Sequence, residues 1–157
     1  MDIGSKSSYP AGKLSNFTAF EFEFDGVKCA SMEGLLQSFK FENINSQVAT
    51  CALIGFQAKK KGRGRNIYWQ RCQTLWWNGV AYPRKSKEYQ KLLDRAYQAL
   101  FEQNEKFKDA LRASGKAVFT HSIGESNKKK TVLTESEFCG RLQHLKDYEL
   151  KECVNEE

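Results

Sequence analysis

The first regular feature of the chain is an alternation of apolar and charged side chains. Between Phe20 and Phe24 every second residue is a phenylalanine and the residues between them are glutamates. This is the period of a half-buried β-strand. Asp25 and Gly26 follow as a turn dipeptide, so the pattern predicts a β-hairpin whose second strand covers residues 27–30.

After this hairpin the apolar period lengthens to that of a helix. Ser31 can cap the helix, and Glu33 lies in its first turn, where the helix dipole favours a negative charge. The predicted core face consists of Met32, Leu35, Leu36 and Phe39. Glu33, Gln37 and Lys40 share an adjoining face. This polar stripe is either a solvated helix surface or the wall of a polar pocket, and the pattern leaves both open.

The middle of the chain alternates between helical patterns and breaks. We expect one helix over residues 46–61, and a short buried helix over the aromatic segment 66–79, closed by its Asn-Gly pair. Residues 86–103 give the clearest helical periodicity. Residues 104–115 either continue that helix or begin another one, which ends at a glycine.

The C-terminal part combines a strand-like segment, a loop and a helix. Residues 116–124 have strand character, and 125–130 form a polar loop. Thr134 and Glu137 make a capping box that opens a helix. Its predicted inward-facing residues are Phe138, Leu142 and Leu145.

Length and composition indicate one globular domain. The chain has 157 residues, of which 40% are hydrophobic and 13% aromatic, enough for a real core. We predict a single, mainly helical α+β domain over 1–157, with a core at about 9–146, a flexible N-terminus and a charged C-terminal tail. No stretch resembles a signal peptide or reaches the roughly 20 apolar residues of a membrane span. We therefore expect a cytoplasmic protein without a membrane partner, in the host cytoplasm if the chain is phage-encoded.

The net charge indicates an anionic partner, and the residue types and spacings argue against metal and P-loop chemistry. The net charge of +6 favours an anionic partner such as nucleic acid, a nucleotide or phosphate. The two histidines do not cluster with cysteines, and no phosphate-binding glycine motif is present. We expect neither a metal nor a cofactor. Most of the five cysteines are predicted to be buried thiols in a reducing compartment: Cys29, Cys51, Cys72, Cys139 and Cys153.

Three further features have both a structural and a functional interpretation. The basic run from Lys59 to Arg65 is either a solvated helix end, which the pattern favours, or a phosphate contact. Trp69 is either a core residue or a platform for a nucleobase. His121 and Ser122 are either a structural pair or polar groups at a ligand site, and the sequence does not decide between these.

Several of these residues together resemble the signature of the NADAR family, the YbiA-like proteins. That signature has an LSNF segment, a strand pair, and then S-x-E-x-x-x-Q-x-x-K-F. The matching positions are Leu14, Ser15, Asn16, Phe17, Ser31, Glu33, Gln37, Lys40 and Phe41. The likeness continues through Gly64, Arg65 and Trp69, and then through 104–115 and 131–142. It therefore covers nearly the whole chain.

The resemblance implies a compact, mostly helical α+β fold and an N-glycosidase acting on ribosides, without a metal. Glu33 is then the catalytic carboxylate. The implied substrate-binding residues are Ser15, Asn16, Phe17, Gln37, Lys40, Arg65, Trp69, His121 and Ser122. Many family members carry an Asp followed by Trp-Gly near the C-terminal strand. This chain has "THSIGES" there, so His121 and Ser122 are candidate replacements.

The leading hypothesis is a hydrolase that removes ADP-ribose from guanine in DNA or RNA. A rival in the same class hydrolyses riboside phosphates of the riboflavin pathway. A rival from another class binds ADP-ribose or a similar nucleotide without turnover. A purely structural interaction protein ranks last.

Overall fold

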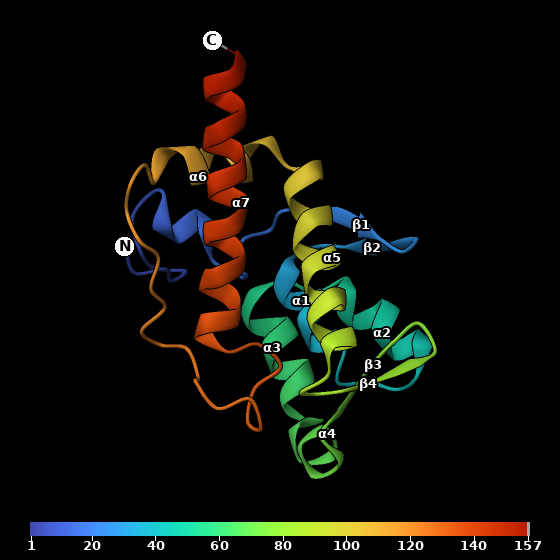
Figure 1. Ribbon diagram of the computed structural model, residues 1–157. Helices are drawn as coiled ribbons and strands as arrows, with labels where there is room; N and C mark the ends of the chain where they lie inside the picture. The colour runs from blue at the N-terminus through green and yellow to red at the C-terminus, as the bar shows by residue number, and fades with distance from the viewer. Residues whose placement is uncertain (157) are drawn as a thin grey trace.

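The computed structural model describes residues 1–156, with side chains through residue 152 (Figure 1). It confirms a mainly helical α+β domain with small antiparallel sheets. In chain order the elements are the 3₁₀ helix η1 (Ala11–Leu14), β1 (Phe22–Phe24), β2 (Val27–Cys29), α1 (Met32–Ser38), α2 (Ile44–Cys51), α3 (Gly55–Arg63), α4 (Asn66–Cys72), β3 (Thr74–Trp77), β4 (Val80–Pro83), α5 (Lys87–Gln103), α6 (Glu105–Ala113) and α7 (Glu135–Glu156).

The first hairpin forms as its alternation predicts. β1 pairs antiparallel with β2, and Phe22 and Phe24 are buried while Glu23 between them is exposed. Asp25 and Gly26 both adopt positive φ, at 48° and 82°, the backbone of the tight turn that matches strand twist. The indole Nε1 of Trp77 donates to the Asp25 carboxylate at 2.9 Å, which ties this turn to the second hairpin.

Helix α1 forms the centre of the fold. The Ser31 hydroxyl accepts from the backbone N–H of Gly34 at 3.1 Å and so caps the helix. The four predicted core residues are all buried: Met32, Leu35 and Leu36 in the helix, and Phe39 at its C-cap. Helices α2, α3 and α5 pack around α1. Gly34 permits the close approach of α2, because a Cβ there lies 2.6 Å from the carbonyl oxygen of Leu53.

The single helix predicted over residues 46–61 is wrong, since α2 and α3 are separate helices. Gly55 adopts a φ of +49°, a left-handed conformation that interrupts a right-handed helix. Carbonyl groups near the break find partners outside the helix. The Ser31 hydroxyl donates to Leu53 at 3.1 Å, and the N–H of Ala30 donates to Cys51 at 2.8 Å.

The helix predicted over 66–79 is only half correct. Helix α4 ends at Cys72, Gln73 turns with a φ of 49°, and the chain then forms the antiparallel hairpin β3–β4. Leu75 and Trp77 are buried, while Thr74 and Trp76 are only partly covered. The run of aromatic residues concealed this period of two, and the Asn-Gly pair is the hairpin turn.

The last two long helices begin where the sequence predicts. Ser86 caps α5, and Asn104 separates it from α6 with φ −135° and ψ 103°. At α7 the capping box forms: the N–H of Glu137 donates to the Thr134 hydroxyl, and Glu137 Oε1 accepts from the N–H of Thr134. The predicted inward-facing residues of α7, Phe138, Leu142 and Leu145, are buried.

The strand expected over 116–124 does not form. Within the described residues it makes a single isolated bridge, Asp2 with Thr120, because its neighbour is the short N-terminal segment. The N–H of Ile3 donates to the Thr120 carbonyl at 2.8 Å, and the Ile3 side chain is fully buried. Among the helices of the described part of the chain, none has the length and apolar character that crossing a bilayer requires.

The cysteines are more varied than predicted. Cys29 and Cys51 are buried, Cys139 is half-buried, and Cys72 is exposed at the end of α4. These four are free thiols. Cys153 lies outside the residues whose side chains are described.

Candidate active site

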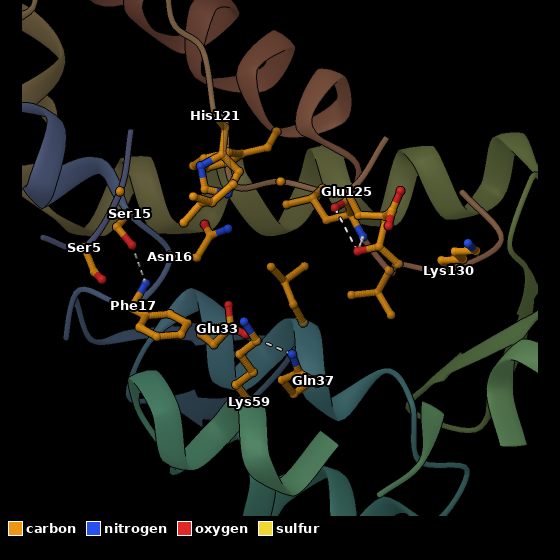
Figure 2. Close-up of a pocket in the computed structure, with 18 of the residues that line it drawn as sticks. Ser5, Ser15, Asn16, Phe17, Glu33, Gln37, Lys59, His121, Glu125 and Lys130 are labelled. Carbon is orange, nitrogen blue, oxygen red and sulfur yellow. Dashed lines mark hydrogen bonds between the residues drawn. The ribbon is translucent and has the colours of Figure 1, made fainter. Parts of the chain in front are cut away.

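A cavity of about 400 Å³ opens between the start of α1, helix α3 and the loop that precedes α7 (Figure 2). Ligand pockets commonly have this volume. In Figure 2 Glu33, Gln37 and Lys59 lie on one side of the cavity, His121 and Glu125 lie on the other, and Asn16 lies between them. The chain brings these residues together from four distant segments.

Glu33 is the acidic group in the wall formed by α1. Its N–H donates to the carbonyl oxygen of Asn16 at 3.0 Å, which fixes the first turn of α1 against the segment 14–17. Burial raises the pKa of the Glu33 carboxyl above its ordinary value. A hydrogen bond from Gln37 at 2.8 Å and the nearby charges of Lys40 and Lys59 lower the pKa in part. Burial has the larger effect.

Gln37 is held beside Glu33 by the close packing of α3. A Cβ at Gly62 lies only 1.7 Å from Oε1 of Gln37, so any other residue at this position displaces the amide. Its Nε2 is thereby kept on Oε1 of Glu33. A glycine of the basic run therefore has a packing role in the site.

Asn16 presents a hydrogen-bond donor to the cavity. The buried Tyr97 hydroxyl donates to Oδ1 of Asn16 at 2.8 Å. Because that oxygen is occupied by a donor, the amide nitrogen is the group left for a ligand. The neighbouring Ser15 hydroxyl accepts from the N–H of Phe17 at 3.1 Å, so Ser15, Asn16 and Phe17 form a fixed wall.

Lys40, Arg65 and Trp69 lie behind the wall and do not line the cavity. The Lys40 ammonium donates to Oδ1 of Asn66 at 2.7 Å, and the Trp69 indole donates to the same oxygen at 3.3 Å. Burial lowers the pKa of Lys40 to about 8. These contacts position Asn66, which does line the cavity. Trp69 is fully buried, so the structure does not offer its ring for stacking on a base.

His121 and Ser122 have different positions. His121 lines the cavity, with Nδ1 at 2.7 Å from the Ile3 carbonyl oxygen and its ring against Phe138. The side chain of Ser122 does not line the cavity, because its hydroxyl donates to Asp2 at 2.6 Å.

The wall opposite Glu33 is fixed by a buried ion pair. Arg84 donates to Glu137 at 2.6 Å and to the carbonyl oxygen of Thr131 at 2.8 Å. Burial of Glu137 acts to raise its pKa, but hydrogen bonds from Arg84 and Gln90 prevail and lower it to about 2. The Tyr89 hydroxyl donates to the Val132 carbonyl oxygen at 2.6 Å. The lining segment 131–133 is therefore anchored to α5 and α7.

The sequence did not identify several lining residues as ligand contacts. Lys59, Asn66, Glu125, Lys130 and Thr131 all contribute to the wall. Lys59 lies in the basic run, for which a phosphate contact was one interpretation. The others lie in a helix start and a polar loop, and their composition resembles that of any solvated segment. No spacing rule relates them to Glu33, so only the fold identifies them.

The site combines a carboxylate of raised pKa, an amide donor and two lysines. Such a carboxylate can stabilise a cationic centre and take a proton from water, while the lysines attract an anionic group. Within the described residues no group of His, Cys, Asp and Glu is arranged to hold a metal ion.

Comparisons with known proteins agree with this fold. The model of a family described as bacteriophage protein GP30.3 matches residues 8–147. An uncharacterised 17.1 kDa protein of Enterobacteria phage T4, from the Gp30–rIII intergenic region, is 37% identical over 151 residues, which are 94% of this chain and 97% of the relative. The NMR structure of Escherichia coli YbiA is similar in fold, with a TM-score of 0.63 and 18% identity over 98% of this chain and 86% of YbiA.

Proposed function

Because the chain belongs to the bacteriophage GP30.3 family, a NADAR-like family with the YbiA fold, we propose that it is an N-glycosidase. In this proposal the substrate is a guanine base in nucleic acid that carries ADP-ribose. The bond that is hydrolysed joins this base to the ribose of ADP-ribose. The observation that carries the proposal is the half-buried Glu33 carboxylate, which faces a cavity with cations and amide donors.

The chemistry of the bond explains why a carboxylate is needed. Breaking the C–N bond produces positive charge on the ribose, and a nearby carboxylate stabilises this oxocarbenium-like state. The electron pair of the broken bond stays on the guanine nitrogen, and Glu33 orients water and accepts its proton as the water attacks. That proton then passes to the guanine nitrogen, which restores the carboxylate. A general base works best when its pKa lies near the operating pH, and burial moves the pKa of Glu33 in that direction.

The neighbouring groups suit an anionic substrate. Lys59 and Lys130 line the cavity and can neutralise the pyrophosphate of ADP-ribose. Asn16 offers its amide nitrogen to a ring atom or a ribose hydroxyl. Gln37 holds the carboxylate of Glu33 in one orientation. Since the T4 relative is a phage protein, we expect the activity in the cytoplasm of an infected bacterium.

The same pair of lysines supports a second candidate. They bind a single phosphate as readily as a pyrophosphate, so a riboside phosphate of the riboflavin pathway is the alternative substrate. A protein that binds ADP-ribose without turnover is the alternative outside the enzymes. It is favoured by the segment at His121, which lacks the acidic residue that many NADAR proteins carry there.

The test is to incubate the protein with guanine-ADP-ribosylated single-stranded DNA and to measure free ADP-ribose. We expect release by the wild type and a loss of roughly a hundredfold or more in Glu33→Gln, with ADP-ribose still raising the melting temperature of both. Glu42→Gln is the matched control, because Glu42 is exposed and lies outside the cavity.

Each other outcome selects an alternative. Full activity of Glu33→Gln refutes the role of its carboxylate. If the wild type is stabilised by ADP-ribose but releases none, riboside phosphates are assayed next. Binding without any turnover across these substrates supports the non-catalytic module.

A further inference from the structure

The helices α3 and α4 belong to a segment with an extreme charge balance. Residues 43–87 contain nine lysines and arginines and no aspartate or glutamate. Six of these cations lie on α3, on α4 or between them: Lys59, Lys60, Lys61, Arg63, Arg65 and Arg71. The net charge of the protein is therefore concentrated at one end of the fold.

These six cations have no close carboxylate partner in the protein, although Lys59 acts on the Glu33 carboxylate at longer range. In the part of the chain with described side chains, none of the six forms an ion pair. Three of them contact aromatic rings instead. The Arg65 guanidinium lies 4.3 Å from the ring centre of Tyr68, the Arg63 guanidinium lies 5.7 Å from the ring centre of Phe56, and the Lys61 ammonium lies 6.0 Å from the ring centre of Phe41. Unpaired cations at close spacing repel one another, and an external polyanion relieves that repulsion.

Large apolar side chains are exposed among the cations. Phe56 is 62% exposed, Ile67 73% and Tyr68 66%. Aromatic side chains beside cations are the arrangement by which proteins bind single-stranded nucleic acid, since unpaired bases stack on the rings while phosphates contact Lys and Arg. A duplex has its bases already stacked and cannot use these rings.

This surface continues into the wall of the cavity. Lys59 of α3 and Lys130 of the loop before α7 both line the cavity. Gln70 and Gln73, at the end of α4, donate to the carbonyl oxygens of Lys130 and Lys129 at 3.2 and 3.0 Å. In Figure 1 α4 and this loop lie at the end of the molecule away from the C-terminus. The loop adds Lys128, Lys129 and Lys130 to the cations of the helices.

We propose that this surface is a binding site for the single-stranded nucleic acid next to the target nucleotide. We call it the basic face, and it consists of Lys59, Lys60, Lys61, Arg63, Arg65, Arg71 and Lys128 to Lys130, with Phe56, Ile67 and Tyr68 among them. Its relation to a target nucleotide rests on the proposed glycosidase function. A base whose bond to ADP-ribose reaches this cavity has to leave its stack, and the basic face holds the unstacked strand beside the cavity.

The first test measures binding without any turnover. Fluorescence anisotropy follows a labelled, unmodified oligothymidine over a range of salt concentrations. The double variant Arg63→Glu/Lys129→Glu removes two exposed cations, and its matched control is Lys91→Glu/Lys106→Glu, exposed on α5 and α6. We expect the basic-face variant to bind at least about tenfold more weakly and to show a shallower salt dependence, with no change in the control. Tyr68→Ala is expected to lose roughly tenfold at unchanged salt dependence.

The second test separates this proposal from the glycosidase function. On ADP-ribosylated oligonucleotide the basic-face variant should raise KM about tenfold at unchanged kcat, while free ADP-ribosylated guanosine should be hydrolysed at the wild-type rate. Failure of the wild type to cleave either substrate overturns the glycosidase function and leaves the binding result to stand by itself.

Three results overturn the basic face itself. They are absence of wild-type binding to the oligothymidine, an equal loss of affinity in the control variant, and tighter binding to anionic lipid vesicles than to the oligothymidine.

Discussion

Replacing Gly62 by alanine changes the site without touching its carboxylate. The added Cβ lies 1.7 Å from Oε1 and 2.7 Å from Cδ of Gln37. Ordinary contacts begin near 3.4 Å, so the amide oxygen has to move by about 1.7 Å. The Gln37 amide nitrogen donates to Glu33 at 2.8 Å, and a displacement of this size breaks the bond.

Two effects of opposite sign determine the change in stability. A hydrogen bond to a charged group contributes roughly 1.5–3 kcal/mol. Alanine in a helix interior is about 1 kcal/mol more favourable than glycine. We expect a net loss of about 1 kcal/mol in the free energy of unfolding, which for a chain of this length lowers Tm by roughly 2–4 °C.

The effect on activity has a definite direction. The hydrogen bond from Gln37 favours the charged form of Glu33, so its loss raises the pKa of Glu33 further. The acidic limb of the kcat/KM profile on ADP-ribosylated DNA therefore moves to higher pH, as measured by initial rates between pH 4 and pH 8 (roughly the range over which a perturbed glutamate titrates).

Gly64→Ala is the matched control. It lies two residues further along, at the C-cap of α3 with φ −63°, and a Cβ there meets only the Lys61 carbonyl oxygen at 3.8 Å. We expect the pH profile and Tm of Gly64→Ala to match those of the wild type. A wild-type acidic limb in Gly62→Ala would refute the link from α3 through Gln37 to Glu33.

Three further predictions concern the titration and orientation of the site. Because the pKa of Glu33 is raised in the native state, its charge at pH 7 destabilises the fold, and Glu33→Gln should raise Tm at this pH. The gain in Tm should disappear below the ordinary pKa of glutamate, where Glu33 is protonated in both the native and the unfolded state. A gain of the same size at pH 7 and below that pKa contradicts this reasoning. Above about pH 8 Lys40 loses its proton and with it part of its hold on Asn66, so kcat/KM of the wild type should fall there. Lys40→Met has no ammonium to titrate, so its pH profile should lack this fall at high pH. Tyr97→Phe keeps the cavity shape but frees Asn16, and should lower kcat/KM about tenfold with a stability loss near 1 kcal/mol; wild-type kinetics would show that Asn16 needs no orienting hydroxyl.

Some residues of the candidate site can be predicted from the sequence pattern, and others are identified only by the fold. The positions of Glu33 and Gln37, one turn apart on a capped helix, follow from local spacing alone, because residues four apart on a helix are neighbours. The resemblance adds Ser15, Asn16 and Phe17. Lys59, Asn66 and Lys130 have no such local relation to Glu33, and they reach the cavity only because α3 and the loop before α7 pack against α1.

Trp69 is another residue whose role the sequence pattern left open and the fold decided. A tryptophan beside cations is compatible with both a core residue and a stacking platform, and the full burial of Trp69 decides for the core. The preceding residue, Tyr68, instead has an exposed ring beside those cations. Which of two adjacent aromatic residues faces solvent depends on how α4 is rotated against its neighbours.

The sequence by itself determined the first hairpin, the helices α1, α5 and α7 and their caps, because periodicity, turn dipeptides and capping residues act over a few positions. The tertiary structure alone decided the break between α2 and α3, the membership of the cavity wall and the raised pKa of Glu33. Each of these depends on burial or on a hydrogen bond between residues far apart in the chain, and burial exists only once those distant segments have packed together.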